Sequence, residues 1–211
     1  MLYGRVVGLR PVEPDDLGFL AELANHPQVR ASVVGWDWPA ARSPRPGADP
    51  GRPFAVVLAA TGQIVGRTGL WDLDWHNQSA TTRIELMPGL TPKGAGTDAI
   101  MTLMAWAFYE VGLRRLHSTI LDFNAASHGA YVRKCGWQIE GREREAVFRH
   151  GRWNDRLHLA ILKREFDTLL DAEEYVGRLS APPTAPALTP LREPVPGPEL
   201  ASIWQDLASA S

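Results

Sequence analysis

One stretch decides the fold: Thr81-Thr-Arg-Ile-Glu-Leu-Met-Pro-Gly-Leu-Thr-Pro-Lys-Gly-Ala-Gly-Thr97. Its first seven residues are typical of a β-strand, and the Pro-Gly pair that follows ends that strand. We expect residues 92–96 to be irregular and Thr97 to open a helix. Apolar residues then recur at helical spacing and predict one buried helical face, made of Ile100, Leu103, Met104, Ala107, Phe108 and Val111.

The glycine-rich connection between this strand and this helix is a candidate anion site. The first N–H groups of a helix have no partners within it, and the helix dipole is positive there. Gly94 and Gly96 have no side chains, so a phosphate could approach the backbone, and Lys93 adds a positive charge. A single Gly-x-Gly more often marks an ordinary strand-to-helix connection, so the motif needs support from elsewhere in the chain.

The downstream chain supplies that support. A second strand is predicted over residues 116–123, followed by Asn124-Ala-Ala-Ser127, a short helix with Tyr131, and Lys134-Cys-Gly-Trp137. Together with the glycine-rich loop, these segments resemble the GNAT superfamily of N-acetyltransferases, which use acetyl-coenzyme A (acetyl-CoA). In that family a strand ending in two apolar residues and Pro precedes a loop of the form Gln/Arg-x-x-Gly-x-Gly/Ala, and a later strand leads to an Asn.

Further segments are similar to one branch of the superfamily, the ribosomal-protein N-terminal acetyltransferases of the RimJ/RimL type. The resemblance covers about residues 2–170, and its motifs are specific when they are taken together. The segments that carry it are residues 5–11, 14–16, 25–30, 141–142, 145–149, 151–155 and 163–166. The chain departs from the family pattern in two places. Thr91 stands where the family usually has Gln or Arg, and the stretch from Asn124 to Gly136 is one residue longer than expected.

The resemblance implies an α/β (α+β) architecture, the GNAT fold. Its centre is a mixed, mostly antiparallel sheet of about seven strands flanked by helices. We expect residues 1–170 to form the acetyltransferase domain and residues 171–211 a C-terminal extension. A helix is predicted over residues 167–179, then a linker rich in Pro and Ala over 181–198, and a possible short helix over 199–208.

Composition argues against several functional classes. The 211 residues carry a formal net charge of -2, so bulk charge recruits neither nucleic acid nor an anionic membrane. No apolar run is long enough to span a bilayer, and the start of the chain lacks the apolar core of a secretion signal. The single cysteine, Cys135, excludes an internal disulfide. We expect a cytoplasmic protein.

Acetyl transfer requires that the cofactor be held with its thioester carbonyl polarised. The resemblance implies that backbone groups of Leu86 and Met87 pair with the pantetheine arm and that Asn124 contacts it. It also implies that the diphosphate is held by Lys93 and by the backbone amides of Gly94, Ala95, Gly96 and Thr97. No metal is implied.

The acceptor amine must lose a proton, because free primary amines ionise at about pKa 10, roughly three units above neutral pH. Glu85 is the nearest candidate base, although strand alternation could point it away from the cofactor and a structural role is at least as well supported. Asp37, Asp72 and Asp74 are alternatives, as is a chain of water molecules. Asp72 and Asp74 with His76 also have the residue types of a metal site, but a polar turn explains them better.

The departing thiolate must gain a proton. Tyr131 and Ser127 are candidates, and the resemblance implies a catalytic Tyr about two helical turns after the Asn. A structural role for a buried tyrosine is an equal alternative. His117 alternates with apolar neighbours and is interpreted as structural, and Cys135 is interpreted as a packing residue.

A Pro-rich loop over residues 35–53 interrupts the regular pattern. An ordinary surface insertion is the simpler interpretation. The alternative is that Trp36, Asp37 and Trp38 bind the acceptor, since two indole rings flanking a carboxylate suit a cationic amine.

These features predict an N-acetyltransferase that moves an acetyl group from acetyl-CoA to a primary amine by direct attack in a ternary complex. The acceptor partner would be a small molecule, such as an antibiotic, or a peptide or protein N-terminus. Two alternatives remain: a non-catalytic acyl-CoA-binding module, and transfer of a longer acyl chain past Met87 and Phe108. The chain could also form a homodimer.

Overall fold

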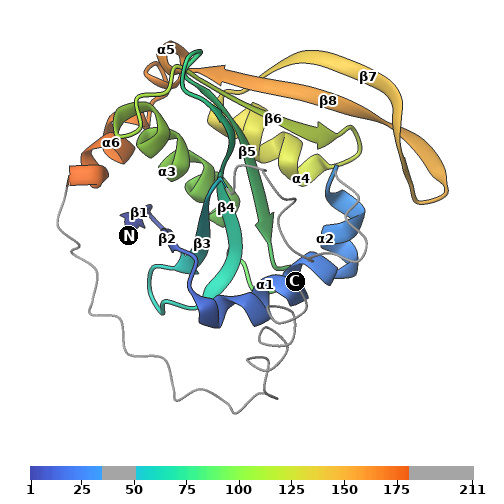
Figure 1. Cartoon of the computed structure of the whole chain (residues 1–211), viewed down its shortest axis with the longest axis horizontal. Coiled ribbons are helices and arrows are strands. Elements are labelled where there is room, and N and C mark those ends of the chain that lie inside the picture. Colours follow the sequence, from blue (N-terminus) through green and yellow to red (C-terminus); the bar gives the residue numbers. More distant parts are fainter. Residues whose placement is uncertain (35–50, 181–211) are drawn as a thin grey trace, which may run out of the picture.

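The computed structural model describes residues 1–34 and 51–180, in which eight strands form one sheet (Figure 1). The strand order is β1-β2-β3-β4-β5-β6-β8-β7, and β5–β6 is a parallel pair within an otherwise antiparallel sheet. The strands are β1 (Leu2–Tyr3), β2 (Val7–Pro11), β3 (Arg52–Leu58), β4 (Ile64–Asp74), β5 (Ser79–Leu86), β6 (Arg115–Leu121), β7 (Gln138–Arg149) and β8 (Arg152–Leu162). This confirms the mixed, mostly antiparallel sheet that the resemblance implied, with eight strands instead of about seven.

Helices cover both faces of the sheet. They are η1 (Pro14–Asp16), α1 (Leu17–Asn25), α2 (Pro27–Ser32), α3 (Ala95–Tyr109), α4 (Ala125–His128), η2 (Gly129–Lys134), α5 (Lys163–Phe166) and α6 (Ala172–Ser180). Leu86 packs in the large core cluster that includes α3, whereas Met87 packs with Leu23 of α1 and Val29 of α2. Because consecutive residues of a strand point to opposite faces, α3 and the α1–α2 pair lie on opposite sides of β5.

The helix α3 begins two residues earlier than predicted. Residues 92–96 were expected to be irregular, but Ala95 and Gly96 belong to the helix. Gly94 is the N-cap residue and has a left-handed conformation (φ +93°), so the helix can begin at the next residue. The predicted face is buried, except that Val111 lies beyond the helix end and is half-buried. The helix is enclosed on other sides as well, since Ala99, Met101 and Ala105 are also buried.

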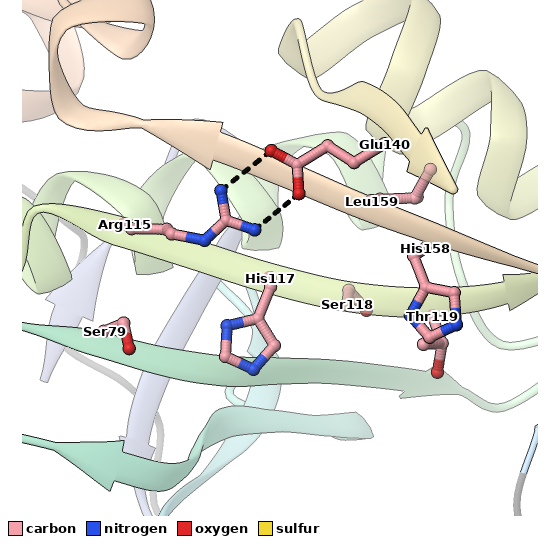
Figure 2. Close-up of a pocket in the computed structure, with 8 residues that line it drawn as sticks. All are labelled: Ser79, Arg115, His117, Ser118, Thr119, Glu140, His158 and Leu159. Carbon is pink, nitrogen blue, oxygen red and sulfur yellow. Dashed lines mark hydrogen bonds and ion pairs between the residues drawn. The ribbon is translucent and has the colours of Figure 1, made fainter. Parts of the chain in front are cut away.

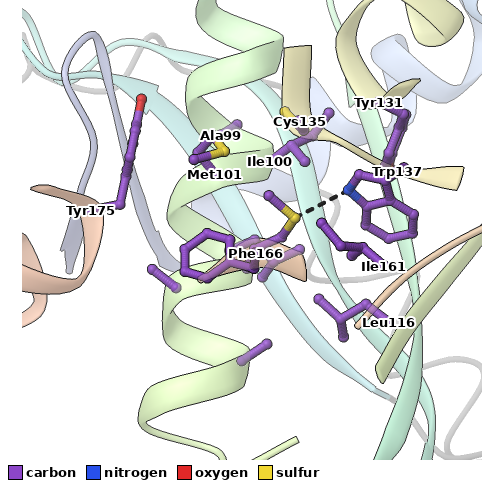
Figure 3. Close-up of a cluster of buried hydrophobic side chains, with 14 of the residues drawn as sticks. Ala99, Ile100, Met101, Leu116, Tyr131, Cys135, Trp137, Ile161, Phe166 and Tyr175 are labelled. Atoms are coloured by element: carbon purple, nitrogen blue, oxygen red, sulfur yellow. Dashed lines mark hydrogen bonds between the residues drawn. The ribbon is translucent and has the colours of Figure 1, made fainter. Parts of the chain in front are cut away.

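A cluster of large side chains joins α3 to the far half of the sheet (Figure 3). The Trp137 indole N–H donates to Met104 Sδ at 3.1 Å. The rings of Tyr131 and Trp137 pack edge to face with centroids 4.9 Å apart. Cys135 is fully buried nearby, with its Sγ 3.8 Å from the carbonyl oxygen of Thr97. These contacts fix the segment after β6 against the first turns of α3.

The helix predicted over residues 167–179 is wrong in extent. The chain forms the short α5, turns, and then forms α6. Phe166 and Tyr175 both pack into the cluster that includes α3. In one continuous helix, residues nine positions apart would point in opposite directions, so the turn is needed to bury both rings. The predicted linker and the helix over 199–208 lie outside the described residues.

Candidate active site

The parallel strands β5 and β6 separate soon after they meet. Their pairing joins residues 79–81 to residues 115–117, whereas β5 continues to Leu86 and β6 to Leu121. Side chains close the vertex on both faces: Ser118 Oγ donates to Thr82 O at 2.9 Å, and Thr81 Oγ1 lies 2.9 Å from His117 Nε2. Beyond this vertex the facing edges of the two strands do not pair with each other. Figure 1 shows the two arrows diverging from that point.

One backbone amide of β5 is aimed into this opening. The N–H of Met87 donates to Val65 O on the opposite side, at 2.8 Å, and the Met87 carbonyl accepts from Thr91 Oγ1 at 3.0 Å. Since successive N–H groups of a strand point to opposite edges, the N–H of Leu86 faces the side of β6. Of the two residues predicted to pair with a pantetheine arm, Leu86 therefore presents its N–H to the opening, while the N–H of Met87 is occupied.

The predicted glycine loop lies at the end of β5. Within α3 the first hydrogen bond runs from Asp98 N–H to Gly94 O, at 2.9 Å, so the N–H groups of Gly96 and Thr97 have no acceptor inside the helix. A Cβ on Gly94 would meet no atom within 4 Å, and a Cβ on Gly96 would lie 3.4 Å from Leu86 Cδ1. The exposed Lys93 precedes them. The loop is thus open to solvent and adjoins the separated strands.

The residue inserted between Asn124 and Gly136 has a structural counterpart. Asn124 Oδ1 caps α4 by accepting from Ser127 N–H at 3.0 Å, and its Nδ2 donates to Ser32 O at 3.3 Å. The following η2 is a π-helical turn, which holds one more residue than an α-helical turn would. The half-buried Ser127 lies on α4, and Tyr131 follows inside the π-helical turn.

Tyr131 brings a buried hydroxyl to the vertex of the separated strands. Its side chain is 3% exposed. Burial raises the pKa of Tyr131 above its ordinary value, and the neighbouring hydroxyls of Thr82 and Ser118 act in the opposite direction. These two residues are the ones that form the Ser118–Thr82 bridge. The hydroxyl is therefore a protonated donor placed where β5 and β6 part.

Glu85 lies on the face of β5 opposite Leu86, and its carboxylate is already engaged. Arg67 of the neighbouring β4 donates through Nε and Nη2 to the two carboxylate oxygens, both at 3.0 Å. The Glu85 side chain is 14% exposed and that of Arg67 36% exposed. Both oxygens of this carboxylate are therefore already bound by a single guanidinium.

The other candidate residues fall elsewhere. Asp74 closes a turn by accepting from Asn77 N–H at 2.8 Å and Nδ2 at 2.7 Å, which supports its interpretation as a polar turn. Asp72 adopts a left-handed conformation (φ +50°) in the same irregular end of β4. Trp36, Asp37 and Trp38 lie outside the described residues. Burial raises the pKa of Cys135 to about 12, as expected for a packing residue.

A cleft of about 280 Å³ opens beside the vertex and was not anticipated from the sequence (Figure 2). It is lined by Ser79, Arg115, His117, Ser118, Thr119, Glu140, His158 and Leu159. Arg115 pairs with Glu140, and His158 pairs with Glu143. Burial and the charge of Arg115 lower the pKa of His117, which favours the neutral imidazole bonded to Thr81. Arg115, Glu140 and His158 of the cleft lining are thus each already engaged by a partner.

The chain matches the acetyltransferase (GNAT) domain family over residues 7–138. It therefore belongs to that family. The putative ribosomal N-acetyltransferase YdaF of Bacillus subtilis is 28% identical over 110 residues, which make up 52% of this chain and 60% of that protein. The matched region spans about three fifths of the curated relatives' length.

Solved structures share the fold. The spermidine N-acetyltransferase from Vibrio cholerae, in complex with CoA and spermine, superposes with a TM-score of 0.64 at 22% identity, covering 77% of this chain and 98% of that one. RimJ from Mycobacterium smegmatis, in complex with CoA-disulfide, superposes with a TM-score of 0.63 at 23% identity, covering 82% and 87%. In the part of this chain that the structure describes, no helix is long and apolar enough to cross a membrane.

Proposed function

We propose that this chain is an acetyl-CoA-dependent N-acetyltransferase that acetylates a primary amine by direct attack in a ternary complex. One observation carries the proposal: the opening between β5 and β6 has an N–H donor facing it from one strand, a buried hydroxyl at its vertex, and beside it a helix N-terminus whose cap residue is a glycine. Membership of the GNAT domain family supports the same chemistry.

The cofactor would lie along β5. Its diphosphate would accept from the backbone N–H groups of Gly94, Gly96 and Thr97, next to Ala95, with Lys93 adding charge. The pantetheine arm would extend past Leu86, whose N–H faces the opening and would polarise the thioester carbonyl. A donor aimed in this way contributes about 3–4 kcal/mol in studied enzymes. Asn124, three residues after β6, would approach the other side of the arm through the second lone pair of its carbonyl oxygen, because its side chain caps α4, its N–H donates to Leu121 O at 2.9 Å and its carbonyl already accepts from His128 N–H at 3.0 Å.

The chemical step would be an addition followed by elimination. The amine nitrogen bonds to the thioester carbon, the carbon–sulfur bond breaks, and the thiolate takes a proton from Tyr131. The amine's proton leaves through solvent or a carboxylate, and restores the tyrosine after product release. Ser127, one turn earlier, is the second candidate donor. A donor must hold its proton until the thiolate forms, which suits the raised pKa of Tyr131.

Glu85 lies on the face of β5 that also carries Met87, α1 and α2. On this side we place the acceptor, because the other side of β5 is filled by α3. The Glu85 carboxylate would attract the ammonium form of the acceptor, although the Arg67 guanidinium offsets much of its charge, and the acceptor's proton would leave through water. The names of the similar proteins suggest two acceptor classes to test: a polyamine and a ribosomal component.

The test is release of free CoA thiol from acetyl-CoA in the presence of amines: spermidine, an aminoglycoside, and a short peptide with a free N-terminus. The proposal expects turnover with at least one amine and none without an amine. CoA binding without turnover on any amine would instead favour the acyl-CoA-binding module. The bond of Thr91 to Met87 O favours that alternative, since it leaves no side chain from that position for the diphosphate.

A further inference from the structure

Asp98, in the first turn of α3, holds a buried carboxylate on which two distant parts of the chain converge. Its side chain is enclosed, and the residue is 4% exposed. Oδ2 accepts from the backbone N–H groups of Val6 at 2.7 Å and Val7 at 2.8 Å. Oδ1 accepts from Arg5 N–H at 2.8 Å and from the Tyr175 hydroxyl at 2.6 Å. Each oxygen thus has two donors, which stabilises a charge held away from water.

The surrounding chain is shaped to allow this approach. A Cβ on Gly4 would lie 2.4 Å from Asp98 Oδ2, so any larger residue at position 4 would displace the carboxylate. Arg178 of α6 donates to Gly4 O at 3.2 Å, and the Arg5 guanidinium pairs with Asp171 and Glu174. These bonds hold the turn between β1 and β2 and the helix α6 against the same point of α3.

The carboxylate is directly linked to the cofactor loop. The N–H of Asp98 makes the first hydrogen bond of α3, to Gly94 O at 2.9 Å. Gly96 and Thr97, whose N–H groups have no acceptor in the helix, lie between these two residues. Figure 3 shows Tyr175 on the opposite side of α3 from Tyr131 and Trp137, so the first turns of the helix are held from both sides. A displacement of Asp98 would move the N–H groups of the loop.

We propose that Tyr175 and Asp98 are positioning residues for the cofactor: their hydrogen bond fixes the first turn of α3 so that the loop N–H groups converge on the diphosphate. This inference rests on the proposed function. Under this inference α6, which lies within the C-terminal extension expected from the sequence, supports the cofactor loop without contacting the cofactor itself.

The first experiment compares Tyr175→Phe with Tyr109→Phe by calorimetric titration with CoA. Both variants lose one hydroxyl that bonds to a carboxylate and keep the ring. Tyr109 bonds to Asp167 Oδ1 at 2.8 Å at the far end of the same helix. We expect the affinity for CoA to fall about tenfold in Tyr175→Phe, since a hydrogen bond to a charged group is lost, and to stay unchanged in Tyr109→Phe.

The second readout separates positioning from general destabilisation. S-acetylpantetheine carries the thioester but lacks the diphosphate. Tyr175→Phe should raise KM for acetyl-CoA about tenfold at unchanged kcat, while its KM for S-acetylpantetheine equals that of the wild type. Asp98→Asn, tested where it folds by circular dichroism, should show the same selectivity with a larger loss.

Unchanged CoA affinity in Tyr175→Phe would overturn the inference. An equal loss in Tyr109→Phe, or an equal rise in KM for S-acetylpantetheine, would overturn it as well, because either result assigns the effect to stability alone. A wild-type protein that does not bind CoA would instead refute the proposed function, and the inference would fall with it.

Discussion

The hydroxyl of Ser118 donates to the carbonyl oxygen of Thr82, at 2.9 Å, one position beyond the last backbone pair of β5 and β6. A hydrogen bond from a side chain therefore replaces the next backbone hydrogen bond between the two strands, and it marks the position where they separate. The hydroxyl of Tyr131 lies beside the same two residues. This hydrogen bond thus joins the vertex of the opening to the place of the proposed proton donor.

Replacing Ser118 with Ala should weaken catalysis more than it weakens the fold. The lost bond is neutral and buried, so we expect the free energy of unfolding to fall by about 1 kcal/mol. We expect kcat to fall more than tenfold, because Tyr131 loses a neighbour that orients its hydroxyl. Ser79→Ala, at the paired end of β5, is the control, and an equal loss of kcat in both variants would contradict the assignment.

Tyr131→Phe should lower kcat by about a hundredfold while leaving the affinity for CoA unchanged, because it removes a proton donor and keeps the ring that packs on Trp137. Single-turnover kinetics with acetyl-CoA and the best amine would measure the effect. Wild-type turnover would exclude Tyr131 as the acid. Ser127→Ala would then become the decisive variant.

As the pH is raised, kcat should not decrease through deprotonation of Tyr131 at any pH below 10. Burial raises the pKa of Tyr131 above its ordinary 10.0, so the folded protein holds this proton more tightly than the unfolded chain. The associated stability is fully present below about pH 10 and is lost as pH rises through the raised pKa. A descending limb of kcat near neutral pH that disappears in Tyr131→Phe would contradict this assignment.

Glu85→Gln tests whether this carboxylate accepts the proton directly. Because Arg67 already binds both oxygens, we expect kcat to fall less than tenfold and KM for the amine to rise. Initial rates at saturating acetyl-CoA would separate the two effects, with Asp72→Asn as the control. A hundredfold loss of kcat together with loss of the acidic limb of the pH profile would show that Glu85 is the base.

The parts of the fold that could be predicted are those encoded locally. The β5 strand, the glycine loop and α3 follow one another within a single stretch, and each has its own pattern of apolar or glycine residues. The turn at His150 and Gly151 between β7 and β8 is encoded locally as well, since histidine and glycine are both enriched in the left-handed conformation that they adopt there.

What could not be predicted depends on contacts between distant residues. Asp98 directly follows the predicted helix start at Thr97, yet its side-chain partners lie 77 to 93 positions away. The pairing of Glu85 with Arg67 depends on the register of two strands. The extra residue after Asn124 was visible in the sequence, but the π-helical turn that holds it was not, and that turn carries Tyr131, whose ring packs on Trp137 outside the turn.

The central claim is that the backbone at the start of α3 binds the cofactor diphosphate, and calorimetric titration of Gly94→Asp with CoA tests it most directly. Gly112→Asp is the matched control, because Gly112 follows the same helix, has φ +80° against +93° for Gly94, and likewise has open space around its Cβ position. Both variants carry a similar backbone penalty of about 1–2 kcal/mol. We predict that Gly94→Asp lowers the affinity on the order of a hundredfold through charge repulsion, while Gly112→Asp binds as the wild type does. Equal affinity in the two variants would contradict the claim.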